Sequence, residues 1–134
     1  FQYQRSIDPQ STLRIAADLY PQMYSSNQMG FGGEFAYLRK IPTGTNPEIN
    51  TSFYVGAALG AAYANTKVNN VSYPILTITP QILAGLNYFL TPELSLFGEV
   101  SAGPSYVSES GGGNSISAWG LAFHGRTGIN YSFR

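Results

Sequence analysis

The chain has 134 residues, and its seven basic and seven acidic side chains give a formal net charge of zero at pH 7. This length suits one domain, and a neutral chain gives no electrostatic basis for binding nucleic acid. The absence of cysteine excludes a disulfide framework and a cysteine-ligated zinc site. Only 10% of the residues are charged, against roughly a quarter in an ordinary soluble domain, whereas Tyr and Gly are abundant. This composition indicates a single domain, residues 1–134, built on a sheet whose two faces differ in polarity.

Seven segments are predicted to be strands, because apolar residues recur at every second position along them. No apolar run approaches the roughly 18 residues of a membrane helix, but most of these segments match the ~10 residues that a tilted strand needs to cross a bilayer. In chain order the predicted strands are residues 1–7, 12–24, 30–42, 51–64, 73–90, 94–107 and 116–133.

Short and long connections are predicted to alternate between these strands. Residues 8–10, 46–48 and 91–93 each have a central proline, which suits a tight turn because its φ angle is preset. The connections at 25–29, 65–72 and 108–115 are longer and polar. This alternation is typical of outer-membrane barrels, which have tight periplasmic turns and longer external loops.

The two faces of each predicted strand differ in size as well as polarity. In the last strand Leu121, Phe123 and Ile129 share one face, whereas the opposite face is mostly Gly, Ala and Ser. Small residues fit the interior of a narrow barrel, so the bulky apolar face is expected to point toward lipid. A soluble ligand-binding barrel is the alternative, but its outer face would normally have many Lys and Glu residues.

Several ionisable residues fall on the small-residue face and are predicted to form a structural charge network in the lumen. Without the histidine they comprise three acids and three bases, and a dehydrated interior requires such mutual pairing. His124 is expected to lie roughly across from Glu99. The predicted network consists of Arg14, Asp18, Glu34, Lys40, Glu99, His124 and Arg126.

Aromatic residues and prolines are predicted to mark the two membrane boundaries. Pro21, Pro80 and Pro104 each lie roughly one bilayer crossing from a short turn, where the strand ladder is expected to loosen or bulge. Two aromatic girdles are typical of membrane barrels. The predicted girdle residues are Tyr63, Tyr106 and Trp119 at the outer level, and Tyr88, Tyr131 and Phe133 at the opposite level.

The C-terminal residues 128–133, Gly-Ile-Asn-Tyr-Ser-Phe, resemble the terminal signal of bacterial outer-membrane barrels, although Arg134 follows the usual final Phe. The strand–turn–strand at 88–99 is also similar to that family. The resemblance implies a small eight-stranded barrel in the bacterial outer membrane, in contact with lipid and lipopolysaccharide. It also implies recognition of the last strand by the barrel-assembly machinery. The chain starts directly with alternating residues, so we expect a mature sequence whose signal peptide has been removed.

The fold class expected is therefore all-β: an antiparallel up-and-down transmembrane barrel with seven strands visible. Bacterial single-chain barrels have even strand numbers. An eighth strand is therefore expected to be missing at the N-terminus or supplied by another chain, unless several copies share a larger barrel.

Three classes of function remain open. The first is a structural role that anchors a partner or presents loops for interaction, and the second is a narrow pore, formed within one barrel or by subunit assembly. The third is a lipid A-modifying enzyme, for which Glu99, His124 and either Ser101 or Ser117 would form a triad. Because His124 is expected to face inward, we predict no enzyme activity and no catalytic, cofactor-binding or metal-binding residue.

Overall fold

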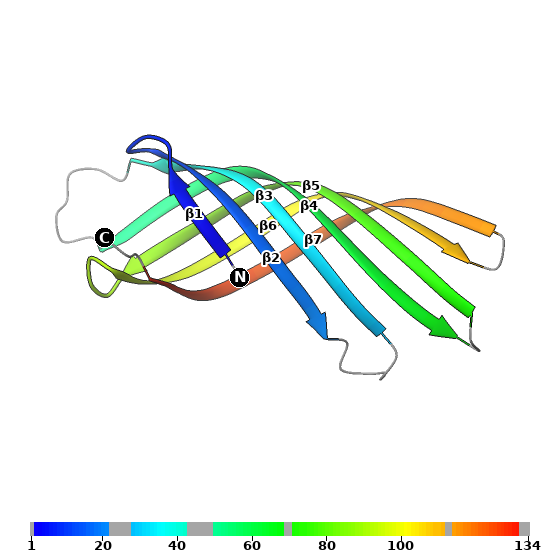
Figure 1. The fold of residues 1–134 in the computed structure, drawn as a ribbon. Coiled ribbons are helices and arrows are strands. Elements are labelled where there is room, and N and C mark those ends of the chain that lie inside the picture. Colours follow the sequence, from blue (N-terminus) through cyan, green and yellow to red (C-terminus); the bar gives the residue numbers. More distant parts are fainter. Residues whose placement is uncertain (1, 22–27, 43–49, 69–70, 112–113, 132–134) are drawn as a thin grey trace.

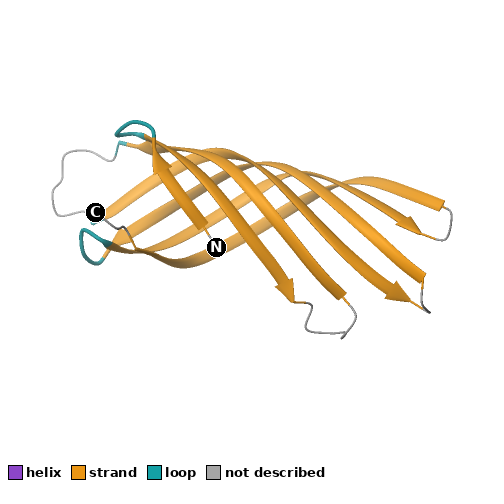
Figure 2. Ribbon diagram, in the orientation of Figure 1, coloured by secondary structure: helices purple, strands orange, loops and turns teal. Residues whose placement is uncertain are grey.

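The computed structural model describes residues 2–21, 28–42, 50–68, 71–111 and 114–131, with no side-chain description for 18–21, 28–29, 66–68, 71 and 131. All its regular elements are strands (Figure 2). Within these ranges no helix is long and apolar enough to cross a membrane. The strands are β1 (Gln2–Ser6), β2 (Ser11–Pro21), β3 (Gln28–Ile41), β4 (Thr51–Val68), β5 (Val71–Phe89), β6 (Leu94–Gly111) and β7 (Asn114–Tyr131).

Each strand pairs antiparallel with the next one in the chain, giving one seven-stranded sheet in the order β1 to β7. The predicted all-β, up-and-down topology is therefore confirmed. The sheet is twisted and curled, so that the β1–β2 hairpin lies in front of β6 and β7 (Figure 1). Among the described residues no strand pairing joins β1 to β7, so the sheet has two edges.

The predicted assignment of residues to the two faces is also confirmed. In β2 the Arg14 residue is only 1% exposed, whereas its neighbour Ile15 is 55% exposed. In β6 the polar residues Glu99 and Ser101 are buried, whereas Val100 between them is exposed. Because successive strand residues point to opposite faces, the small and charged residues line the inside of the curl and the apolar residues cover its outside.

Two of the three short turns are present as predicted. In the β1–β2 turn, Oδ1 of Asp8 accepts hydrogen bonds of 2.7 Å from the backbone N–H groups of Gln10 and Ser11. In the β5–β6 turn, Oγ1 of Thr91 accepts a hydrogen bond of 3.0 Å from the Leu94 N–H group. These side chains satisfy turn donors that the strand ladder leaves free. The turn predicted at 46–48 lies outside the described residues, as do residues 25–27 of the first predicted loop.

The prediction of long loops at 65–72 and 108–115 is wrong. Strands β4 and β5 continue to Val68 and Val71, and β6 and β7 continue to Gly111 and Asn114. Polar composition does not end a strand ladder when the two strands satisfy one another's backbone groups. In the β4–β5 hairpin the polar side chains also pair, since Ser72 Oγ donates to Asn65 Oδ1 at 2.6 Å.

Pro80 and Pro104 lie where the β5–β6 ladder is interrupted. The strands pair from Ile75 to Ile78 and again from Ile82 to Phe89, but no pairs join residues 79–81 to 103–105. The register is the same on both sides of the gap, so the interruption is a loss of pairing without a bulge. A proline has no N–H group to donate to the ladder, and the predicted loosening is found at Pro80 and Pro104, whereas Pro21 stays paired with Met29.

Candidate functional site

Arg14, the fourth residue of β2, is the centre of a buried ion-pair network inside the curled sheet. Its Nε and Nη2 atoms donate to Oε1 of Glu34 on β3 at 3.2 and 2.7 Å. Its Nη1 and Nη2 atoms donate to the two carboxylate oxygens of Glu99 on β6 at 2.5 and 2.9 Å. A guanidinium group has donors on several sides of one plane, so this single side chain connects strands far apart in the sheet order.

Arg126 on β7 is the second cation of the network. It donates to both carboxylate oxygens of Glu34, with its Nη1 atom 3.0 Å from Oε1. The same Nη1 atom lies 3.9 Å from Glu99. The Arg126 side chain is 28% exposed, whereas those of Arg14 and the two glutamates are almost fully buried. Two cations and two carboxylates give a buried cluster without net charge, as burial requires.

Two neutral side chains, Tyr54 and Gln81, complete the hydrogen bonding of the two carboxylates, and a third, Ser101, holds Gln81. The Tyr54 hydroxyl donates to Glu99 at 3.0 Å, and the Gln81 amide donates to Glu34 at 2.8 Å. The Ser101 hydroxyl in turn donates to the Gln81 carbonyl oxygen at 2.6 Å. Across the described residues, no buried side-chain nitrogen or oxygen lacks a hydrogen-bond partner. A fully satisfied polar network fixes the positions of the strands that contribute to it.

The structure brings together four of the seven residues predicted for the lumen network: Arg14, Glu34, Glu99 and Arg126. Lys40 and His124 lie in register with inward-facing Tyr54 and Ser101 as predicted, but both are exposed and neither joins the network. Lys40 is one residue from the end of β3, where the sheet gives little cover. The side chain of Asp18 is outside the described part of the structure.

His124 does not lie across from Glu99 as predicted. The β6–β7 register pairs Glu99 with Arg126 and Ser101 with His124. The midpoint of this β6–β7 register lies between positions 112 and 113, whereas the predicted partner of His124 required a midpoint between 111 and 112. A shift of one residue in the centre of a hairpin changes every cross-strand partner by two positions.

Tyr54 and Gln81 were not identified from the sequence. Tyr54 is a polar side chain on a strand face that is otherwise mostly Gly and Ala, whereas Gln81 shares its face with Thr79 and Asn87. Both residues alternate along the chain with exposed apolar neighbours, Val55 and Ile82. This alternation is the sequence signal that could have identified them as inward-facing.

The predicted girdle residues that the structure describes lie on the outer face. The Tyr106 and Trp119 rings form a cross-strand pair with centroids 5.1 Å apart, and Tyr63 packs against Phe31 at 5.5 Å. Tyr88 is exposed near the opposite end, paired in register with Leu96. The side chain of Tyr131 and all of Phe133 lie outside the described residues.

Two of the groups considered for a hydrolytic triad, Glu99 and Ser101, are engaged in other hydrogen bonds. The carboxylate of Glu99 is bonded to Arg14 and Tyr54, and the hydroxyl of Ser101 is bonded to Gln81. A nucleophile needs its base within hydrogen-bond reach and the base needs an orienting group. No such chain includes His124 in the described structure, and no group of three or more potential metal ligands occurs there.

The chemical capacity of the network is therefore to hold strands together by paired charges in a solvent-poor interior. Comparison with protein-family models, curated proteins and solved structures found no match for this chain.

Proposed function

We propose that the protein is an integral β-barrel of the bacterial outer membrane with a structural role, anchoring a partner or presenting its hairpins for interaction. The supporting observation is the distribution of polarity between the two faces of the sheet. The ionised groups of the network are buried inside, while Ile82, Leu121 and Phe123 are among the most exposed side chains outside. Water would oppose this arrangement, whereas a bilayer stabilises it.

The extent of the apolar surface supports the same proposal. Exposed large apolar side chains occur on every strand from β2 to β7 rather than in one patch. Contiguous apolar patches above a few hundred Å² mark surfaces that a partner or a membrane covers. A band that extends around a curled sheet fits a membrane better than it fits one protein partner.

The long hairpins are the proposed interaction surface. Strand β4 continues from the aromatic Tyr63 to Val68, and β6 continues from Tyr106 to Gly111. Figure 1 shows the β4–β5 and β6–β7 hairpins projecting at one end of the sheet. In the proposed barrel these hairpins extend outside the membrane and take the place of the long loops expected from the sequence.

Closure of the barrel requires an eighth strand. Since consecutive strands are antiparallel, β1 and β7 run in the same direction, and a closed antiparallel barrel needs one strand between them. The five-residue β1 also pairs with only residues 12–16 of β2. We propose that a strand preceding β1, or a strand from another chain, fills this position.

The test is gel mobility in SDS with and without boiling, on protein refolded into detergent. A shift on boiling, together with β-type circular dichroism, is the expected result for a closed membrane barrel. The apparent mass of the unboiled band then shows whether one chain or several form it. Absence of a shift, combined with solubility in plain buffer, would contradict the proposal.

The narrow pore is the second candidate. The exposed inner face of β7, including Gly120 and His124, leaves space beside the network. However, the network crosses the interior from β2 and β3 to β6 and β7, and small barrels are generally filled by side chains. Planar-bilayer recording separates the two roles, because a structural barrel shows no steady conductance.

A further inference from the structure

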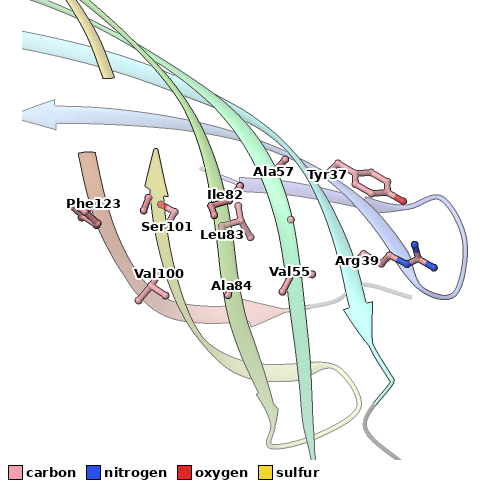
Figure 3. A pocket seen from close by; sticks show the side chains of 12 residues that line it. Tyr37, Arg39, Val55, Ala57, Ile82, Leu83, Ala84, Val100, Ser101 and Phe123 are labelled. Carbon is pink, nitrogen blue, oxygen red and sulfur yellow. The ribbon is translucent and has the colours of Figure 1, made fainter. Parts of the chain in front are cut away.

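A shallow apolar cavity of about 680 Å³ lies on the outer face of the sheet (Figure 3). Its floor is formed by three small residues on neighbouring strands, Ala57 on β4, Ala84 on β5 and Ala102 on β6. Larger side chains, including Phe123 on β7, surround this floor. Arg39 is the only charged residue in the lining of this cavity. We call it the apolar hollow.

A second cavity of about 430 Å³ lies beside it at the β1–β2 turn and is lined by residues 8–11 together with Tyr37 and Arg39. We call it the turn hollow. Tyr37 and Arg39 line both cavities, and Figure 3 shows their side chains extending from β3 toward the turn. The Tyr37 hydroxyl is hydrogen bonded to Ser11 Oγ at 2.9 Å, which holds the ring at the boundary. An apolar cavity that adjoins a polar one suits an amphipathic ligand.

The turn hollow has one negative and one positive group. The hydrogen bond from the Gln10 backbone N–H group is the main factor that lowers the pKa of Asp8, and hydrogen bonding by Ser11 and the nearby Arg39 lower it further. The carboxylate is therefore ionised at neutral pH. Within the described structure Asp8 and Arg39 form no direct ion pair, and both residues are exposed. Two separated, opposite charges match a headgroup that is itself dipolar.

We propose that the two hollows bind one phospholipid with a primary-amine headgroup, its phosphate on Arg39, its ammonium on Asp8 and an acyl chain along the apolar hollow. A guanidinium group binds phosphate through two parallel hydrogen bonds, and an ammonium group donates to a carboxylate. An anionic headgroup would satisfy Arg39 but be repelled by Asp8. A quaternary ammonium has no N–H group to donate. This inference rests on the proposed membrane location.

The positions of the lining residues along their strands fit this orientation of the lipid. Arg39 lies two residues from the end of β3, and in register with it lie Val55 and then Ala84. Ala57 and Ala102 lie one outward-facing position further along their strands, away from the β1–β2 turn. A headgroup at the turn therefore directs its chain toward the middle of the proposed bilayer.

The experiment is native mass spectrometry of the refolded full chain in detergent, with phosphatidylethanolamine, phosphatidylcholine and phosphatidylglycerol of identical acyl chains. We expect phosphatidylethanolamine to be retained about tenfold more than the other two, the ratio given by one charge-assisted interaction. Arg39→Gln should remove most of this retention, whereas the control Arg5→Gln, which removes an exposed cation on β1, should not. Asp8→Asn, whose side-chain oxygen can still accept the turn hydrogen bonds, should abolish the preference over phosphatidylcholine. Ala84→Phe, which fills the apolar hollow, should lower retention of all three lipids.

Equal retention of the three lipids by the unaltered protein would overturn the inference, as would unchanged retention in both Arg39→Gln and Ala84→Phe. Each variant is also run in SDS with and without boiling, so that a folding failure is recognised. A protein that shows the mobility shift but no lipid preference contradicts only the lipid site. A protein without the shift contradicts the membrane barrel itself.

Discussion

Arg14 is the central residue of the buried charge network, because its guanidinium group donates to both buried carboxylates. The four charges of the network balance only as a set. Removing one carboxylate leaves two cations facing a single anion in a place that water hardly reaches. Breaking a buried ion pair in this way typically costs more than the intact pair contributes to stability.

Glu99→Gln is therefore expected to destabilise the folded protein by about 3 kcal/mol, because it keeps the side-chain shape but leaves Arg14 incompletely neutralised. The measurement is urea unfolding in lipid vesicles, followed by the fluorescence of the single tryptophan. The matched control is Lys40→Gln, which removes an exposed charge outside the network. Equal unfolding midpoints for the two variants would show that the network does not stabilise the fold.

Gly103 faces the interior where the β5–β6 ladder is interrupted. A Cβ atom at this position would meet the backbone carbonyl group of Pro80 and lie 2.8 Å from the Cα atom of Gln81. Backbone atoms have little freedom to move aside. Only glycine allows this close approach of the two strands.

Gly103→Ala is expected to lower stability by about 1–3 kcal/mol, the usual cost of forcing extra atoms into a packed site. Gly120→Ala is the control, because a Cβ atom at Gly120 would meet nothing within 4 Å. The temperature at which the folded band disappears on SDS gels measures both variants. A Gly103→Ala protein as heat-resistant as Gly120→Ala would contradict the close contact.

At the scale of strands, the sequence predicted the order of the elements and their faces well. Both follow from a two-residue period, which is a local property and survives small errors in the boundaries. The network could be predicted only as a set of charges on one face. Which charges meet depends on how tightly the sheet curls, and no local pattern contains that information.

The errors at the same scale have a common origin in the turns. Residues 65–68 and 108–111 were expected in loops because they are polar, yet they extend β4 and β6. Similarly, the expected partner of His124 was wrong because the centre of the β6–β7 hairpin lies one residue further along. Composition indicates where a turn is permitted, whereas the register depends on which two residues form it.

At the scale of the whole molecule, the outer face is the feature that distinguishes a membrane barrel from a soluble one. Trp119 is a direct probe of that face, since the residue is 72% exposed and its ring forms a tilted pair with Tyr106. In the proposed barrel this ring lies among lipids near the interface. In a soluble barrel it would lie in water.

We therefore expect Trp119 fluorescence in vesicles to be quenched strongly by lipids with brominated acyl chains and weakly by acrylamide. The same protein unfolded in urea without vesicles provides the control, in which acrylamide quenches freely. Acrylamide quenching in vesicles that equals the quenching in urea would place the ring in water and contradict the membrane orientation.

The members of the buried network are far apart in the sequence, and this separation affects the order of folding steps. Arg14 and Glu99 are 85 positions apart, and the four charged members belong to four different strands. The β2–β3 hairpin contains the Arg14–Glu34 pair, and the β6–β7 hairpin places Glu99 opposite Arg126, so each hairpin can compensate its own network charges as it enters the hydrocarbon. The bonds from Arg14 to Glu99 and from Arg126 to Glu34 join the two hairpins and form only when both ends of the chain are inside together. Completion of the network is thus a late step, and its rate is governed by the closure of long-range contacts rather than by the formation of individual hairpins.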